Sequence, residues 1–332
     1  MRDRVVVITG ASSGFGRGAA LAFAERGAKV VAVARRKRAL KELEKHCRKL
    51  GTRILILDTD VSNAEEVEKL TSRAIREFGK IDVWVNNAGV GAVGRFDEIP
   101  LEEHEQLIRT NLLGTLYGSY FALREFRKRG VGTLINMSSF AGKIATPYLS
   151  SYSASKFGVR GLDMALRQEL EQNEETNIHV CTIMPVSFDT PFFEHAANHS
   201  GKPVRPVPPV YDPQKVIDTI VDLARNPRDE VVVGTAGRLG NVQYRVSPKM
   251  MERFMGRNTH KAQMETEGTA RQHSGSIFEP MSSGTEVRGG WIDERGSHTT
   301  AKLLSIAVPA AIGLALLARK RNRLREELDQ VA

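Results

Sequence analysis

The chain has 332 residues, 41% of them hydrophobic and 26% charged, and a formal net charge of +9. A chain of this length can bury one large core and carry an additional segment, and the charge favours anionic partners such as a phosphorylated cofactor. Nucleic acid is not expected, because no motif for it is present and few aromatic residues lie among the basic ones. Cys47 and Cys181 have no spacing that suits a disulfide framework or a zinc site, so we expect no metal and a reducing cytoplasm.

Short β-branched apolar segments alternate with segments of helical periodicity up to about residue 235. This alternation is typical of an α/β fold, a Rossmann-like doubly wound parallel sheet with helices on both faces, in which ligands bind beyond the carboxyl ends of the strands. A long helix is predicted at 101–129 and another at 212–225. Strands are predicted at 4–9, 28–34, 53–58, 81–89, 132–137, 178–185 and 230–234.

A glycine-rich sequence, TGASSGFG at 9–16, joins the first strand to the first helix. Gly10, Gly14 and Gly16 have the spacing GxxxGxG, which lets the backbone turn sharply and approach a pyrophosphate. The helix that follows offers free amides and a positive dipole to the same group. The sequence therefore predicts a dinucleotide site here.

The end of the second strand bears on which nicotinamide cofactor is used. A carboxylate there would bind the ribose 2′-hydroxyl, but this chain has Ala34, Arg35 and Arg36. Arginine makes bidentate charged hydrogen bonds to a phosphate, so we predict NADP(H) rather than NAD. In the alternative interpretation, the two arginines only begin a basic helix face.

Three residues at 139–156 predict chemistry on a carbonyl or an alcohol. Tyr152 and Lys156 lie about one turn apart on a predicted helix, so the ammonium would stand beside the phenol. A nearby positive charge lowers the pKa of a tyrosine from roughly 10 and makes it a general acid and base. Ser139 follows a predicted strand and would hydrogen-bond a substrate oxygen. A tyrosine and a lysine at this spacing can also be a solvated helix face.

Together these motifs resemble the short-chain dehydrogenase/reductase family in its one-domain form, over about residues 1–235. NNAG at 86–89 matches the family's central-strand motif, and Asn111 matches the asparagine that holds a water on the proton relay. The resemblance implies that Lys156 also holds the nicotinamide ribose and that Asp60 contacts the adenine ring, with a structural cap as the alternative for Asp60. The cofactor-binding positions predicted in total are Gly10, Ser12, Ser13, Gly14, Phe15, Gly16, Arg35, Arg36, Asp60, Val61, Asn87, Ala88, Gly89, Tyr152, Lys156, Pro185, Val186 and Thr190.

The sequence departs from the family pattern after the strand at 178–185. The family commonly has Pro-Gly there, whereas this chain has Pro185 and Val186, and Thr190 is a candidate contact of the nicotinamide carboxamide. The proline-rich segment 192–213 is predicted to be a lid over the substrate, and its phenylalanines suggest an apolar pocket wall. We expect His195 and His199 to be exposed and without a catalytic role.

Three units are expected: a catalytic domain at 1–235, an irregular or partly helical linker at 236–300, and an apolar segment with a basic tail at 301–332. Residues 303–318 carry no charge, and as a helix they would span roughly 24 Å of a bilayer core of about 30 Å, so a full crossing is marginal. We expect a cytoplasmic protein associated with the membrane surface through 303–325. The alternative is a helix docked on the protein or on a dimer mate.

The function predicted is an NADP(H)-dependent oxidoreductase that interconverts a carbonyl and an alcohol on a lipophilic small molecule. By family resemblance, the protein is expected to be a homodimer or homotetramer. Two alternatives stay open. One is a soluble 3-oxoacyl thioester reductase of fatty acid synthesis, whose acidic carrier would suit the basic surface, and the other is a non-catalytic NADPH-binding scaffold.

Overall fold

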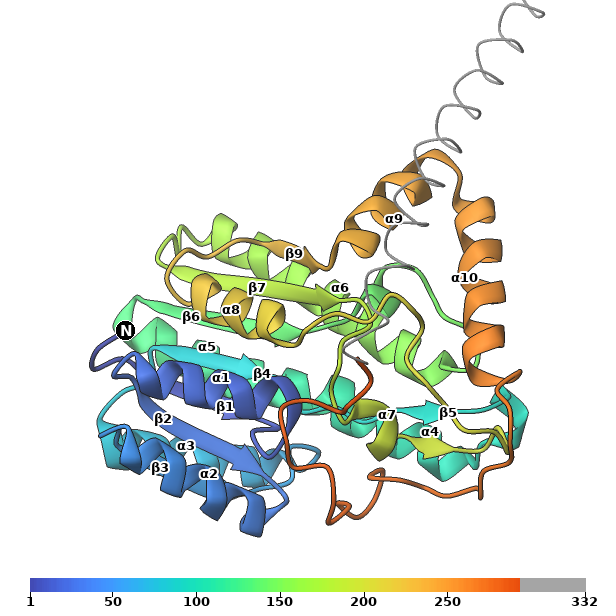
Figure 1. Cartoon of the computed structure of the whole chain (residues 1–332). Coiled ribbons are helices and arrows are strands. Elements are labelled where there is room, and N and C mark those ends of the chain that lie inside the picture. The colour runs from blue at the N-terminus through green and yellow to red at the C-terminus, as the bar shows by residue number, and fades with distance from the viewer. Residues whose placement is uncertain (293–332) are drawn as a thin grey trace, which may run out of the picture.

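Seven parallel strands form the central sheet in the computed structural model, which describes residues 1–292 (Figure 1). Their order is β3-β2-β1-β4-β6-β7-β9, so the doubly wound α/β fold predicted from the sequence is confirmed. The strands are β1 (Val5–Thr9), β2 (Lys29–Ala34), β3 (Ile54–Asp58), β4 (Val83–Asn86), β6 (Gly132–Met137), β7 (Ile178–Pro185) and β9 (Glu230–Val233).

Helices cover both faces of this sheet because each helix returns the chain to the start of the next parallel strand. One face carries α1 (Gly14–Glu25), α2 (Lys37–Lys49) and α8 (Gln214–Leu223), and the other carries α3 (Ala64–Phe78), α5 (Gly114–Arg129) and α6 (Ser150–Gln172). The remaining helices are α4 (Leu101–Ile108), α7 (Phe192–His195), α9 (Thr235–Val246) and α10 (Pro248–Gln263).

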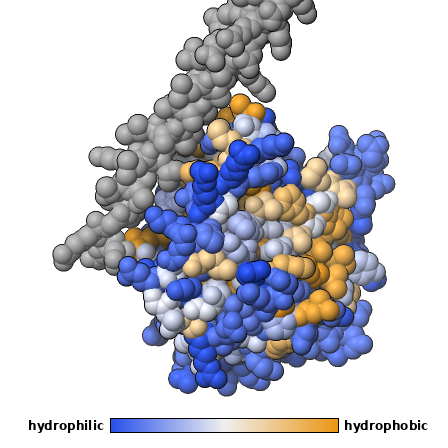
Figure 2. Space-filling view, turned by 90° about the vertical axis from the view of Figure 1, so that its right-hand side faces the viewer, coloured by the Kyte–Doolittle hydropathy of each residue, from blue (hydrophilic) through white to orange (hydrophobic). Residues whose placement is uncertain are grey.

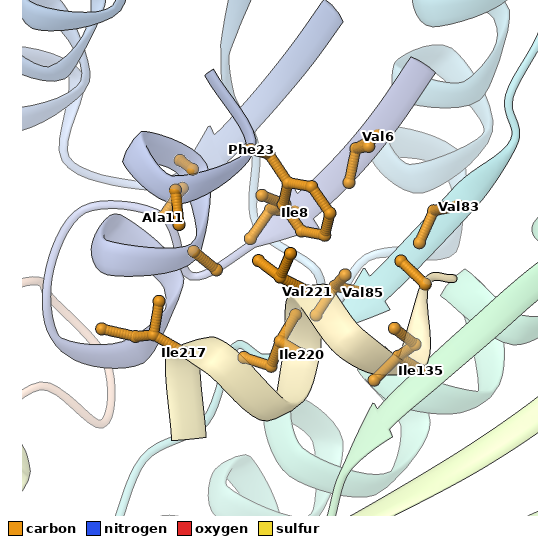
Figure 3. Packing of buried hydrophobic residues seen from close by; sticks show 14 of the residues in the cluster. Val6, Ile8, Ala11, Phe23, Val83, Val85, Ile135, Ile217, Ile220 and Val221 are labelled. Atoms are coloured by element: carbon orange, nitrogen blue, oxygen red, sulfur yellow. The ribbon is translucent and has the colours of Figure 1, made fainter. Parts of the chain in front are cut away.

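One hydrophobic core cluster lies between the sheet and α1 and α8 (Figure 3), and a second lies on the opposite face of the sheet. Ile8 of β1 and Val85 of β4 face Phe23 of α1 and Ile220 of α8, and all four side chains are fully buried. Burying a side chain of this size contributes roughly 1.5–3 kcal/mol. The apolar strands therefore fix the sheet and place the loops that follow them at one edge.

The long helix predicted at 101–129 is continuous but not uniform. A five-residue π-helical turn, Arg109–Leu113, separates α4 from α5 and contains Asn111. Such turns alter the direction of side chains and are frequent at functional sites. Here the turn directs Asn111 into the protein, where its side chain is fully buried.

The chain reverses its direction of winding between β1 and β4, which lie side by side at the centre of the sheet. The loops after these two strands leave in opposite directions and open a crevice beyond their carboxyl ends. A small parallel pair, β5 (Ala92–Val93) with β8 (Ala197–Asn198), adds a ledge that the sequence did not predict.

The segment after α10 returns across the molecule without regular structure. In Figure 1 it runs from the end of α10 beneath the carboxyl ends of the strands and back towards α1. The amide of Gly14 donates to the carbonyl oxygen of Glu286 at 2.9 Å, so this segment reaches the first residue of α1. Among residues 1–292, no helix is both long and apolar enough to span a bilayer. The predicted membrane segment, 303–325, lies outside the described residues.

Candidate active site

The glycine turn lies at the crevice, packed against the end of β4. Gly10 has φ of +67° and Gly14 has φ of +52°, a region that side chains other than glycine rarely adopt. A side chain at Gly10 would come within 2.8 Å of the Cα atom of Ala88. Asn87 fixes this contact, because its side-chain amide donates to the carbonyl oxygen of Thr9 at 3.0 Å. The turn therefore presents bare glycine backbone at the start of α1.

The two arginines at the end of β2 turn towards this bare backbone. Arg36 donates from Nε to the hydroxyl of Ser12 at 3.0 Å and from Nη2 to that of Ser13 at 2.7 Å. Arg35 lies beside it, and its guanidinium donates to the carbonyl oxygen of Phe278 at 2.6 Å. Burial is the main cause that lowers the pKa of Arg36. The structure thus gathers guanidinium, hydroxyl and amide donors at one end of the crevice.

Ser139, Tyr152 and Lys156 meet at the carboxyl end of β6. Tyr152 stands in the first turn of α6 and packs against Phe192, with ring centres 5.3 Å apart. Ser139 and Tyr152 line the same cavity, and Ser139 lies near enough to the Tyr152 hydroxyl to lower its pKa. The Nζ atom of Lys156 donates to the carbonyl oxygen of Met137 at 2.7 Å. These three residues, predicted from spacing alone, are neighbours in the structure.

The pKa of Tyr152 moves in the direction opposite to the one predicted. Burial raises it from 10.0 to about 12, and the nearby side chain of Ser139 offsets only part of this rise. Burial also lowers the pKa of Lys156 from 10.5 to about 8. The prediction considered the charge of the lysine and not the removal of both groups from water, which favours the neutral form of each.

Asn111 lies next to Lys156, and its side chain makes three hydrogen bonds. Its Oδ1 atom accepts from the amide of Val90 at 2.8 Å, and its Nδ2 atom donates to the carbonyl oxygen of Val90 at 2.9 Å and to the hydroxyl of Ser155 at 3.2 Å. A side chain at Gly89 would lie 3.3 Å from Asn111 Oδ1 and 3.6 Å from Lys156 Nζ. The NNAG loop, Asn111 and Lys156 therefore form one packed unit.

Asp60 and Val61 border the crevice on the side of β3. One carboxylate oxygen of Asp60 accepts from the amide of Ser62 at 2.9 Å, so this residue orders its own loop as well as facing the cavity. The cap of α3 is Asn63, whose Oδ1 atom accepts from the amides of Glu65 and Glu66.

Val186 takes the place of the glycine that the family commonly has. Its side chain fills the space beside Gly234 and Gly237, where a Cβ atom on either glycine would collide with it. This contact packs the start of α9 onto the end of β7. Thr190 lies farther along, with its Cβ atom 3.6 Å from the position that a Cβ atom would occupy on Gly14.

The expectation that His195 and His199 are exposed is wrong. His199 is buried, and its Nε2 atom lies 2.8 Å from Oε2 of Glu103, which is also buried. His195 is half-buried beside Arg36, and burial followed by that positive charge lowers its pKa. The small pair β5–β8 draws the predicted lid onto the body of the protein, which explains why its histidines are covered.

One cavity of about 1170 Å³ joins these features. At one end it is lined by the glycine turn, Arg35 and Arg36, and in the middle by Ser139, Tyr152 and Lys156. Its other end is lined by apolar residues that the sequence analysis did not assign to the site. Phe140 follows Ser139, and folding brings in four more from α9 and α10: Leu239, Met251, Phe254 and Met255.

Residues 4–200 match the sequence family described as short chain dehydrogenase. The chain is 34% identical over 335 residues to an uncharacterized oxidoreductase, YxnA, of Bacillus subtilis, covering 97% of this chain and 92% of that protein. It is 35% identical to the 3-ketodihydrosphingosine reductase of Mus musculus over 56% of this chain and 57% of that one. An alcohol dehydrogenase from Thermococcus sibiricus, solved with 5-hydroxy-NADP, superposes with a TM-score of 0.60 at 28% identity, covering 69% of this chain and 95% of that one.

Proposed function

The chain belongs to the short-chain dehydrogenase/reductase family of oxidoreductases, and we propose that it interconverts a carbonyl and an alcohol with NADP(H) as its cofactor. The observation that carries this proposal is the proximity of the Ser139 and Tyr152 side chains in a cavity that also borders the glycine turn. A hydroxyl pair at this place can hold a substrate oxygen while a proton moves.

The residues present fit NADP(H). A side chain at Gly16 would collide with the carbonyl oxygen of Gly10, so the turn has room only for bare backbone, as a pyrophosphate site requires. Arg35 and Arg36 would hold a 2′-phosphate, and the sequence has Ala34 and not a carboxylate at the end of β2. When bound, the cofactor supplies the hydride for the carbonyl carbon. The cofactor-binding residues predicted from the sequence, which run from Gly10 to Thr190, are retained as the proposed contacts of NADP(H).

Tyr152 is the proposed proton donor for reduction. With a pKa of about 12 it holds its proton at neutral pH and can deliver it to the substrate oxygen, which Ser139 keeps in place. Lys156, with a pKa of about 8, carries a positive charge at pH 7 and favours the phenolate that Tyr152 leaves behind. We propose that Asn111 holds a water through which the phenolate regains a proton from solvent.

We propose a lipophilic substrate because the end of the cavity beyond Tyr152 is apolar. Met251 and Met255 of α10 and Phe140 pack together beside Ser139, and flexible methionines adapt to varied apolar chains. Phe254 and Leu239 lie at the rim, 41% and 40% exposed. Figure 2 views the side of the molecule on which α10 lies and shows orange hydrophobic surface beside blue hydrophilic surface. The name of the mouse relative, 3-ketodihydrosphingosine reductase, supports a ketone as the substrate.

We also propose that the protein associates with a second copy of itself and with a membrane. Four large apolar side chains on α5 and α6 are exposed, and we propose that they form the interface of a homodimer: Leu116, Tyr120, Phe157 and Met164. For the membrane we retain segment 303–325 as the proposed contact. Deletion of residues 299–332 followed by cell fractionation tests this contact, and an unchanged membrane fraction would reject it.

The decisive experiment measures reduction of a series of 2-ketones of increasing chain length with NADPH and with NADH. Each added methylene that the cavity buries should raise kcat/KM by up to about threefold until the chain exceeds the cavity. Activity confined to carrier-linked 3-oxoacyl thioesters would replace this proposal with the fatty acid synthesis alternative. Binding of NADPH without turnover of any carbonyl compound would indicate a scaffold.

A further inference from the structure

Residues 276–291, here called the strap, cross the end of the crevice that holds Arg35, Arg36 and the start of α1. They follow the part of the chain that matches the family, which ends at residue 200. Ile277 anchors one end and is fully buried against Val90, Ala92 and Leu107. The strap is therefore a docked part of the protein and not a loose linker.

Both arginines donate to carbonyl oxygens of the strap. Arg35 bonds Ser276 through Nη2 at 2.5 Å and Phe278 through Nη1 at 2.6 Å. Arg36 bonds the carbonyl of Ser283 through Nη1 at 2.8 Å. Guanidinium groups at the end of β2 would otherwise face the 2′-phosphate of a bound NADP(H).

The strap also takes the amide at the N-terminus of α1. Gly14 donates its backbone N–H to the carbonyl oxygen of Glu286 at 2.9 Å. A backbone amide has one hydrogen, so an anion cannot receive this bond while Glu286 holds it. Amides in the first turn of a helix are those that attract phosphate. The strap thus offers oxygens to the same kinds of donors that a dinucleotide phosphate would use.

The second anchor is Trp291, which ends the sequence VRGGW. Its backbone amide and that of Gly289 donate to Oδ1 of Asp189 at 2.8 and 3.0 Å, and its indole N–H donates to the carbonyl oxygen of Thr190 at 3.0 Å. A side chain at Gly289 would collide with that carbonyl oxygen. The glycine permits the close approach, and the tryptophan holds the strap on the loop after β7.

We propose that the strap is a displaceable cover, which occupies phosphate-binding donors of the cofactor site and must lift before NADP(H) can bind. This inference depends on the proposed cofactor. Bonds from arginine or a helix amide to a phosphate are charge-assisted and stronger than bonds to a neutral carbonyl, so the cofactor can displace the strap. Gly284 and Gly290, with φ of +64° and +76°, give the strap points at which its backbone can turn.

The test measures association and dissociation rates of NADPH by stopped-flow fluorescence with the full chain. Trp291→Ala removes the indole bond to Thr190, so the association rate should rise about tenfold while the dissociation rate stays within twofold of the wild type. Phe278→Ala is the matched control, because its side chain is 45% exposed and only its backbone oxygen bonds Arg35. The rates of this control should stay within twofold of the wild type.

Wild-type rates in Trp291→Ala would overturn the strap proposal while leaving the cofactor proposal intact. A wild-type protein that binds neither NADPH nor NADH would instead reject the proposed function. If Trp291→Ala does not fold, Asp189→Ala releases the same anchor by removing the carboxylate that Gly289 and Trp291 share. The association rate of NADPH should then rise in that variant as well.

Discussion

The ammonium of Lys156 lies 5.6 Å from the centre of the Tyr152 ring, one helical turn away, in a site where Lys156 is buried and Tyr152 is partly buried. Desolvation moves the two pKa values apart, from 10.0 to about 12 for the phenol and from 10.5 to about 8 for the ammonium. At neutral pH the tyrosine therefore keeps its proton and the lysine keeps its charge. This is the arrangement that a proton donor for carbonyl reduction needs.

Replacing Tyr152 with Phe removes the proposed proton donor and keeps the ring that packs against Phe192. We expect kcat for ketone reduction to fall by about 10³-fold or more, because proton transfer typically contributes 10²–10⁴-fold to a rate. NADPH binding, followed by fluorescence titration, should stay within a few-fold of the wild type. Gln168→Ala, a change at an exposed position sixteen residues later on the same helix, is the control. A Tyr152→Phe variant with full activity would remove Tyr152 from the mechanism.

The pH dependence of reduction should follow Lys156. Below about pH 7 the ammonium is charged and kcat/KM should be level, whereas above its pKa of about 8 the charge is lost and the rate should fall with a limiting slope of −1. Tyr152, with a pKa of about 12, stays protonated across this range. Lys156→Arg keeps a charge to far higher pH. In this variant the fall of kcat/KM with rising pH should therefore begin above pH 10. If the fall still began near pH 8, a group other than residue 156 would be titrating.

The sheet and the grouping of Ser139, Tyr152 and Lys156 were predictable from the sequence because both depend on local signals. Strands β6 and β7 coincide with the predicted 132–137 and 178–185, since their β-branched and apolar residues are buried along most of each strand. The meeting of Ser139 with Tyr152 follows from one strand–helix unit. The direction of the Tyr152 pKa was not predictable, because spacing shows which charge is near and does not show how deeply both groups are buried.

Most of the features that were not predicted from the sequence depend on contacts between residues far apart in the chain. The bond between Arg35 and Phe278 joins residues 243 positions apart, and the hydrogen bond between His199 and Glu103 joins residues 96 apart. Neither pair has a local pattern that would indicate its partner. The sequence VRGGW likewise gives no sign of its partner, because the contact of Trp291 with Thr190 appears only when the chain is folded.

Arg35 provides the test of cofactor preference. Arg35→Ala removes a guanidinium that would bind the 2′-phosphate, so the Kd for NADPH should rise about 10- to 100-fold, the cost of one or two charged hydrogen bonds. The Kd for NADH, which lacks this phosphate, should change little. Because Arg35 also bonds the strap, the ratio of the two Kd values is the informative measurement. The control is Arg38→Ala, since the side chain of Arg38 is 96% exposed and contacts only Glu42 among its ion-pair partners in the described chain. If the ratio of the Kd values for NADPH and NADH were unchanged in Arg35→Ala, Arg35 would not bind the 2′-phosphate.

Asp163 should make the stability of the protein depend on pH. Its carboxylate is fully buried on α6, where Asn136 donates to Oδ1 at 2.5 Å and Thr182 donates to Oδ2 at 2.6 Å, and burial raises its pKa from 3.8 to about 7. The native state therefore binds a proton more tightly than the unfolded state does. The stabilisation from this proton is fully present below pH 3.8 and is lost as pH rises through 7.

Asp163→Asn cannot titrate, and its amide oxygen can still accept the bond from Asn136. We expect the difference in free energy of unfolding between pH 5 and pH 8, measured with urea, to be smaller in this variant than in the wild type by a few kcal/mol. Asp97→Asn, at a side chain that is 76% exposed, should keep the wild-type difference. If Asp163→Asn retained the full wild-type dependence, a group other than this buried carboxylate would have to bind the proton, and the polar contacts among β6, α6 and β7 would have to hold Asp163 ionised at neutral pH.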